Sequence, residues 1–364
     1  MIEKPVFYTE DLAVGYRGKV LIGGINISVS RGKILTLIGP NGAGKSTILK
    51  TAAKQLDSIS GAVYIDGNDI SAVKGKILAK KISVLMTERI DPELMTCRNI
   101  VESGRYPYTG QMGILSAVDH ERVEEAMRIT SVTEIGESYF NCVSDGQRQR
   151  VMLARAICQE PELLILDEPT SFLDLRHKLE LLNILKKLVR EKNIAVIMSL
   201  HELDMAQRIS DFVICIKNNR VDRCGVPDEI FESDYISALY EIPRGSYNAY
   251  CGSAELMRCE GMPQVFVIAG GGTGCSVFRK LQRENIPFAA GIIYENDIDY
   301  LVAKSLASEV IFAPAFEPMD KSLTERAIAI MDSCKKVICC LKNFGTLNYE
   351  NKILLEYAKQ HNYL

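Results

Sequence analysis

Residues 39–47 read Gly-Pro-Asn-Gly-Ala-Gly-Lys-Ser-Thr and follow the apolar run Ile-Leu-Thr-Leu-Ile at 34–38. They fit the pattern G-x-x-x-x-G-K-[ST] between an expected strand and an expected helix, which indicates a phosphate-binding loop rather than an incidental glycine-rich turn. The glycines let successive backbone N–H groups turn towards phosphate oxygens, and the N-terminus of the helix adds a positive dipole. The sequence therefore predicts a nucleotide site. The binding residues expected in this loop are Gly39, Asn41, Gly42, Gly44, Lys45, Ser46 and Thr47.

An acidic pair follows a second apolar run. Residues 163–166 read Leu-Leu-Ile-Leu and lead into Asp167 and Glu168. Because so apolar a strand would not end in two acids without a cationic partner, we expect Mg²⁺ here, held by Ser46 and Asp167. Lys45 would reach the β- and γ-phosphates, and Glu168 would orient and polarise the attacking water.

Short apolar strands alternate with helical patterns along the first two thirds of the chain. A strand at 194–200 ends in His201, and another spans 211–216. This alternation favours an α/β body with buried parallel strands. A lone histidine is usually structural, but one at the tip of a neighbouring parallel strand would share the edge where the phosphates lie. Between about 92 and 160 the pattern is mainly helical, which predicts a helical insertion.

The composition excludes several classes of protein. The chain has 364 residues, 47% of them apolar and 24% charged, with a net charge of −3. This is globular usage, and it provides no general basic surface for nucleic acid. No apolar run approaches the roughly 18 residues of a membrane-spanning helix, and the acidic N-terminal segment is not a signal peptide. Eleven scattered cysteines without a C-x-x-C pair indicate free thiols in a reducing cytosol.

A second alternation begins after residue 263. The segment 244–263 is rich in glycine and small polar residues and is expected to be a linker between domains 1–243 and 264–364. Strands are expected at 265–269, 288–293, 309–313 and 336–341, each followed by a helix. Four such units predict a small, Rossmann-like domain with a parallel sheet, so that the whole chain is α/β.

The segment 143–150 reads Val-Ser-Asp-Gly-Gln-Arg-Gln-Arg at the start of a helix. Here the chain resembles the ATP-binding cassette (ABC) family, whose signature loop reads L-S-G-G-Q. Further family marks follow: Tyr16 matches the aromatic residue that stacks on adenine, residues 169–174 match the loop after the acidic pair, and His201 matches the switch histidine. The resemblance covers about residues 5–243. It implies an ATPase with the ABC-type P-loop fold and a helical subdomain at about 92–160, with ATP and Mg²⁺ as cofactors.

The resemblance also implies how ATP is used. Two copies of the chain would close head to tail, with each ATP between the phosphate loop of one copy and the signature loop of the other. Ser144, Gly146 and Gln147 would then contact the nucleotide across the interface, with donors and a helix dipole aimed at the γ-phosphate. A monomer would bind ATP yet hydrolyse it poorly.

Two positions depart from the family pattern. Asp145 replaces a signature glycine, and we expect it to point away from the triphosphate and to cap the helix. Thr87 stands where related cassettes place a glutamine that reaches the metal ion and the catalytic water. Threonine is too short to span that gap, so a water or Glu88 would substitute and turnover would be modest.

The segments 96–108, 113–116 and 201–206 resemble one subclass, the ATPase subunits of importers for iron–siderophore, haem and cobalamin complexes. This implies a cytoplasmic protein, peripheral on the inner face of the membrane. Its partners would be transmembrane permease subunits and, indirectly, a substrate-binding protein. The alternative is a soluble cassette protein that acts on ribosomes or nucleic acid. With one phosphate loop and no basic stripe, we expect no nucleic-acid partner.

The loop at 270–274, Gly-Gly-Gly-Thr-Gly, follows the first strand of the C-terminal domain. It misses the dinucleotide pattern G-x-G-x-x-G, because Cys275 occupies the last position. Loops after parallel strands share one edge of the sheet, where α/β folds take ligands. A regulatory domain that senses a small anionic or polar molecule is therefore one prediction. A dimerisation module and a separate enzyme are the competing ones.

Overall fold

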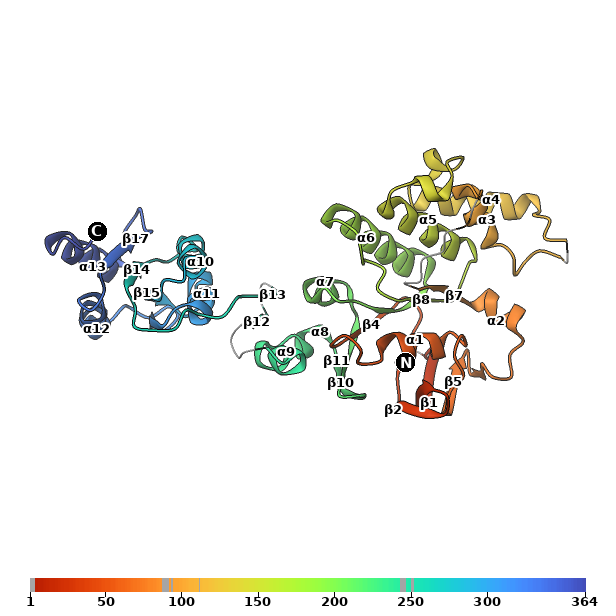
Figure 1. Ribbon diagram of the computed structural model, residues 1–364, viewed down its shortest axis with the longest axis horizontal. Coiled ribbons are helices and arrows are strands. Elements are labelled where there is room, and N and C mark those ends of the chain that lie inside the picture. Colours follow the sequence, from red (N-terminus) through yellow and green to blue (C-terminus); the bar gives the residue numbers. More distant parts are fainter. Residues whose placement is uncertain (1–3, 87–91, 93, 111, 243–246, 250–251) are drawn as a thin grey trace. The chain divides into compact units, whose positions relative to one another are not determined.

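The computed structural model describes residues 4–86, 92, 94–110, 112–242, 247–249 and 252–364 (Figure 1). The chain divides into two compact units, Met1–Phe231 and Glu232–Leu364. This division falls before residue 243, where the sequence predicts the end of the first domain. The expected linker at 244–263 belongs by its contacts to the second unit, and the predicted domain boundaries stay a prediction.

The first unit is built on a mixed sheet of order β11-β10-β4-β9-β8-β7, in which only β10 and β11 pair antiparallel among the described strands. The four neighbouring parallel strands β4, β9, β8 and β7 are almost wholly buried, as continuous apolar runs in a parallel sheet require. The strands are β4 (Ile34–Ile38), β7 (Ile82–Leu85), β8 (Leu163–Leu166), β9 (Ala195–Ser199), β10 (Phe212–Lys217) and β11 (Arg220–Gly225). The α/β prediction is confirmed.

A second, antiparallel sheet belongs to the same unit, and the sequence analysis missed it. Its strands are β1 (Phe7–Tyr16), β2 (Lys19–Ile25), β3 (Ser28–Val29), β5 (Ser60–Ile65) and β6 (Asn68–Asp69). Side chains from both sheets and from α1 share one core, which includes Phe7, Ile25, Leu37 and Ile48. The helices outside the insertion are α1 (Lys45–Ala52), α2 (Gly75–Lys81), α6 (Leu175–Lys192), α7 (Leu203–Ile209) and α8 (Pro227–Ile230).

The described residues of the predicted helical insertion form three helices and two short 3₁₀ turns. They are α3 (Cys97–Ser103), α4 (Ala117–Ile129), η1 (Thr133–Ile135), η2 (Phe140–Cys142) and α5 (Asp145–Cys158). Buried Arg105 holds them together: its Nε donates to Asp119 at 2.8 Å, and its Nη1 donates to the carbonyl of Cys158 and to Glu160. A hydrogen bond from Ser116, joined by Arg105, lowers the pKa of Asp119 to about 2.

The second unit contains the predicted parallel sheet, in the order β16-β15-β14-β17. Helices cover both faces and bury two apolar clusters, one around Phe278 and Phe288 and one around Phe266 and Met331. Its elements are α9 (Ser233–Tyr240), β12 (Tyr247–Asn248), β13 (Ser253–Ala254), β14 (Val265–Ile268), α10 (Cys275–Arg283), β15 (Phe288–Tyr294), α11 (Ile298–Leu306), β16 (Glu309–Ala313), α12 (Lys321–Met331), β17 (Lys336–Cys339) and α13 (Tyr349–Gln360). Each predicted strand and helix of this domain is confirmed to within a few residues.

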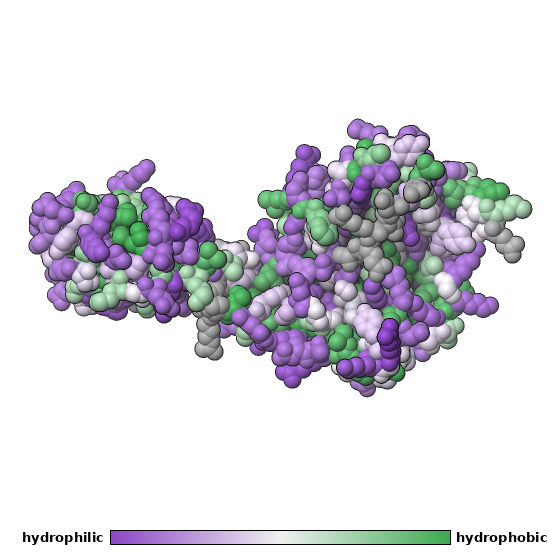
Figure 2. All heavy atoms as spheres, in the orientation of Figure 1, coloured by the Kyte–Doolittle hydropathy of each residue, from purple (hydrophilic) through white to green (hydrophobic). Residues whose placement is uncertain are grey.

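Hydrophilic residues cover most of each unit on the face shown in Figure 2. An exception is the loop between α3 and α4, at the right of the first unit, where apolar side chains gather. Tyr106, Met112 and Ile114 in this loop are each at least 72% exposed. No helix in the described part of the chain is long and apolar enough to cross a membrane.

Candidate functional site

Three neighbouring parallel strands of the first unit end at the same edge of the sheet. In the order β4, β9, β8, they lead into the glycine-rich loop 39–44, into His201 and into Asp167 and Glu168. The carboxyl edge of a parallel sheet is where α/β folds assemble their sites. The topology therefore brings together groups that lie more than 150 residues apart in the sequence.

The glycine-rich loop has a backbone that only glycine tolerates. Gly39 has φ +147°, and a Cβ there would lie 2.1 Å from the carbonyl oxygen of Ile216. Gly44, with φ +100°, directly precedes α1. Lys45 begins that helix and is 5% exposed, with its ammonium donating to the carbonyl oxygens of Gly39 at 2.7 Å and Pro40 at 2.9 Å. Burial lowers the pKa of Lys45, and the nearby carboxylates of Glu168 and Asp167 oppose that shift.

The acidic pair is held by side chains from the neighbouring strand. Buried Asp167 accepts a hydrogen bond from the Ser199 hydroxyl at 2.7 Å, and the same hydroxyl accepts from the backbone N–H of Glu168 at 2.9 Å. Glu168 has a positive φ of 48°, and its two oxygens contact His201 Nε2 and the Ser171 hydroxyl. Ser199 and Ser171 therefore orient the acids. The sequence analysis missed both, although Ser199 is a small polar residue inside an apolar strand.

A cavity of 470 Å³ gathers most of the predicted nucleotide-binding residues. Leu21, which the sequence analysis missed, also lines it. Tyr16, at the end of β1, is 52% exposed. Its hydroxyl oxygen lies 3.3 Å from the hydroxyl oxygen of Thr47. An exposed ring beside a cavity is compatible with stacking on a base. The lining residues are Tyr16, Leu21, Asn41, Gly42, Gly44, Lys45, Ser46, Thr47, Glu168 and His201.

The predicted signature loop does not line this cavity. Ser144 is the N-cap of α5: its hydroxyl accepts from the N–H of Gln147, whose side chain accepts from the N–H of Ser144. The expectation that Asp145 caps the helix is therefore wrong. Asp145 is exposed in the first turn and lies 3.7 Å from Arg148. Thr87 and Glu88 lie outside the described residues, so their predicted roles stay predictions.

Comparisons with known proteins agree with this geometry. Residues 22–171 match the family model described as ABC transporter, and residues 288–363 match that of the MJ0874 family. An uncharacterized ABC transporter ATP-binding protein of Methanocaldococcus jannaschii, MJ0873, is 43% identical over 78% of this chain and 98% of that protein. This chain belongs to the ABC transporter ATP-binding proteins. It is an ATP-binding protein of an ATPase family, as the signature loop and phosphate loop predict.

Two further proteins narrow the similarity within the ABC family. The iron(3+)-hydroxamate import ATP-binding protein FhuC of Bacillus subtilis is 39% identical over 64% of this chain and 87% of that protein. Among solved structures, CbiO1 of Clostridium perfringens, part of the ABC transporter complex CbiONQ, superposes with a TM-score of 0.57. It is 27% identical and is matched over 65% of this chain and 94% of that one.

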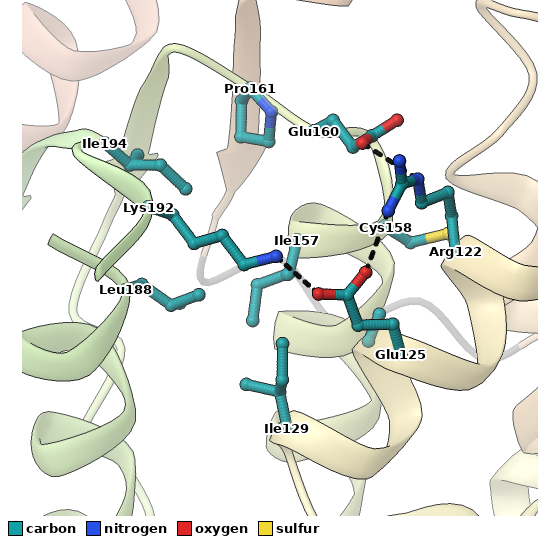
Figure 3. Close-up of a pocket in the computed structure, with 11 residues that line it drawn as sticks. Arg122, Glu125, Ile129, Ile157, Cys158, Glu160, Pro161, Leu188, Lys192 and Ile194 are labelled. Atoms are coloured by element: carbon teal, nitrogen blue, oxygen red, sulfur yellow. Dashed lines mark hydrogen bonds and ion pairs between the residues drawn. The ribbon is translucent and has the colours of Figure 1, made fainter.

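A second cavity of this ABC protein, of 220 Å³, lies between α4, α5 and the end of α6 (Figure 3). Its walls are apolar apart from a row of charges, in which the Glu125 carboxylate lies between Arg122 and Lys192. Lys192 ends α6, whereas Arg122 and Glu125 both lie on α4, so the Lys192–Glu125 pair joins the helical insertion to the sheet-bearing part of the unit. The charged side chains that line this cavity therefore pair with one another.

The glycine-rich loop 270–274 of the second unit is bound by acids of its own domain. Asp297 accepts from the N–H groups of Gly271 and Gly272, and fully buried Asp299 accepts from those of Gly274 and Cys275. Two polar residues in other loops at this edge of the sheet also bond locally: Glu295 accepts from the N–H of Ala315, and Asn348 accepts from that of Gly345. The N–H groups of Gly271, Gly272, Gly274 and Cys275 thus donate to carboxylates of the protein.

Proposed function

We propose that this ABC protein is the ATP-hydrolysing subunit of a membrane importer for iron–siderophore, haem or cobalamin complexes. The observation that carries the proposal is the convergence of the phosphate loop, the acidic pair and His201 on one cavity. In our assignment Gly39, Asn41, Gly42, Gly44, Ser46 and Thr47 enclose the phosphates, Lys45 contacts them and Tyr16 stacks on adenine. Glu168 orients and deprotonates the attacking water, and His201 holds Glu168 in place.

The residues present fit a magnesium ion. Asp167 is a carboxylate only 1% exposed, and it shares its edge of the sheet with Glu168. Lys45 is the cation whose pKa both acids affect, and its ammonium is engaged by loop carbonyls. Two acids at a buried edge favour a divalent cation, which Ser46 and Asp167 would hold. When bound with ATP, the ion would neutralise phosphate charge.

The second half of the proposal is a dimer of two copies around ATP. Ser144, Gly146 and Gln147 form the first turn of α5 but do not line the cavity that contains Lys45 and Glu168. A helix N-terminus that begins with these groups is suited to an anion. A second copy of the chain, turned head to tail, would bring that turn to the γ-phosphate.

The importer assignment rests on relatives and on one surface. FhuC is an import ATP-binding protein, and its similarity to this chain extends over 234 residues. The exposed apolar loop between α3 and α4 offers a contact for permease subunits, which would hold the protein on the inner face of the membrane. A substrate-binding protein would then act with it only through the permease.

Nothing specific favours the alternative on ribosomes or nucleic acid. The lysines of α2 and its N-cap include three that are already engaged: Lys76 donates to the carbonyl of Thr109, Lys80 lies 4.7 Å from the Tyr108 ring centroid and Lys81 pairs with Asp66. For residues 264–364 the ligand-sensing role stays a prediction. The carboxylates on loop 270–274 argue against an anionic ligand at that loop.

The test is ATP-dependent dimerisation of the full chain. Glu168→Gln should bind ATP without hydrolysing it, so that the closed dimer accumulates and elutes earlier in size-exclusion chromatography with ATP than without it. Glu168→Gln combined with Ser144→Ala should elute as a monomer. Co-purification of the unaltered chain with permease subunits encoded beside it would test the importer assignment. A monomer under all nucleotide conditions would contradict the dimer.

A further inference from the structure

His177 lies against the signature loop from a helix that the sequence analysis did not consider. Gly146 is buried in the first turn of α5, and a Cβ on it would lie 3.1 Å from Cγ and Nδ1 of His177 and 3.4 Å from Cδ2. Three ring atoms at such similar distances show that the backbone of Gly146 packs directly on the imidazole. The absence of a side chain at position 146 is what allows this contact.

The His177 ring is held in place by the residue that begins its own helix. Asp174 is the N-cap of α6, and its Oδ1 accepts from the backbone N–H of His177 at 2.9 Å. The same oxygen lies 2.9 Å from Nδ1 of the ring. That bond directs a proton to Nδ1 and fixes the orientation of the ring. The backbone hydrogen bond from His177 also keeps the pKa of Asp174 below its usual value.

Two more contacts join the same segments. Gln149 on α5 donates to the carbonyl of Pro169 at 2.9 Å, and Pro169 directly follows Glu168. Arg150 on α5 lies 3.7 Å from Glu180 on α6. The segment that runs from the acidic pair into α6 therefore contacts the start of α5 and fixes its position.

The residue after His177, Lys178, lies towards the segment that contains His201. Lys178 pairs with Glu202, which also accepts from the Thr170 hydroxyl at 2.8 Å and directly follows His201. Burial alone would raise the pKa of Glu202, but hydrogen bonds from Lys178 and Thr170 hold it below its usual value. One turn of α6 thus contacts the signature loop through His177 and the neighbour of the switch histidine through Lys178.

We propose that His177 is a positioning residue for the signature loop, and that it acts on the ATP bound by the other copy in the dimer. This rests on the head-to-tail dimer of the proposed function. Without the ring, Gly146 loses the surface on which it packs. The donor groups of Ser144 and Gly146 would then no longer be directed at the γ-phosphate. A displacement of about 1 Å in such groups costs on the order of 100-fold in rate.

His177→Ala should therefore lower kcat by about tenfold or more while the nucleotide KM changes little, because the phosphate loop of the same chain is intact. Fluorescent-nucleotide binding and a thermal melt of the full chain check that the variant folds and binds ATP. A second measurement tests the contact itself. Gly146→Ala should lower Tm because its Cβ meets the ring, and adding His177→Ala should restore part of that loss.

Subunit mixing separates an effect on the partner's ATP from an effect within the chain. Glu168→Gln chains cannot hydrolyse their own ATP but have an intact signature loop. Mixed with His177→Ala chains, they should restore ATPase activity well above that of either parent. His177→Ala chains mixed with chains that carry both Glu168→Gln and His177→Ala should show no restoration, because neither copy then has an intact signature loop.

Glu168→Gln mixed with Ser144→Ala is the matched reference. If this pair restores activity and the His177→Ala pair does not, His177 acts within its own chain and the proposal is wrong. Unchanged kcat in His177→Ala would also contradict it. If neither pair restores activity and Glu168→Gln stays monomeric with ATP, the head-to-tail dimer itself is wrong and the role of His177 falls with it.

Discussion

Each unit of the chain has a glycine-rich turn between a buried parallel strand and a helix, and the two turns have opposite surroundings. The turn at 39–44 lines a cavity and precedes Lys45, a buried cation. The turn at 270–274 directs its N–H groups at Asp297 and Asp299 of its own domain. The same local fold thus serves in one case to receive an anion and in the other to bind an internal one.

The two turns differ in the charge of the side chains that neighbouring elements place beside them. In the first unit, Lys45 follows the turn and the acids lie across the edge of the sheet at positions 167 and 168. In the second unit, the acid lies in the first turn of α11, which follows the neighbouring strand β15. There Asp299 accepts from the N–H groups of Gly274 and Cys275 and from the Cys275 thiol. Burial and Asp299 raise the pKa of that thiol to about 12, so it remains protonated.

The largest expected effect concerns hydrolysis at the first turn. Glu168→Gln removes the proposed general base, so kcat should fall by about 10²- to 10⁴-fold while ATP binding is retained. Glu162→Gln is the control, because Glu162 lies just before the start of the same strand in an ion-pair group with Arg31 and Lys81. Steady-state ATPase assays measure both. Equal kcat in the two variants would show that Glu168 does not activate water, and the first turn would then have no catalytic acid to distinguish it from the second.

Binding at the first turn should depend on the cation. Lys45→Ala removes a charge-assisted contact to phosphate, so ATP affinity should fall by about 10- to 100-fold. Lys50→Ala, one turn along the same helix, should leave the affinity unchanged. Isothermal titration of the full chain measures both variants, and the unaltered chain should bind one nucleotide. A stoichiometry of two nucleotides per chain would show that a second nucleotide binds at a site other than the turn at 39–44.

Much of this comparison could be predicted from the sequence, because the relevant patterns are local. The phosphate loop, the acidic pair and His201 each follow an apolar run. Of the site residues predicted in these three segments, all except Gly39 and Asp167 line the cavity. The contacts that orient them are not local. Ser199 reaches Asp167 from the neighbouring strand, 32 residues further on, and Asp299 reaches Gly274 from a helix 25 residues further on. Such contacts depend on the order of the strands in the sheet and on packing, and neither can be predicted from local sequence patterns.

The second turn should depend on Asp299 for stability rather than for function. Asp299→Ala leaves buried N–H groups of Gly274 and Cys275 without their acceptor, which should destabilise the second unit by about 2 kcal/mol. Hydrogen exchange at the start of α10 should quicken, whereas ATPase activity should be unchanged. Glu325→Ala, at an exposed position of α12, is the control. Unchanged exchange in Asp299→Ala would mean that the carboxylate does not hold the turn.

The smallest expected effect is the response of the second turn to free anions. Phosphate added to the unaltered chain should not shift the amide resonances of residues 271, 272, 274 and 275, because carboxylates already accept from these N–H groups. Asp297→Ala should change this little, since Asp299 still occupies the N-terminus of α10 and a carboxylate so close repels phosphate. Only removal of both acids should expose the N–H groups to an added anion. Saturable shifts in the unaltered chain would instead show that phosphate displaces the internal acids, and the two turns would then differ in affinity rather than in kind.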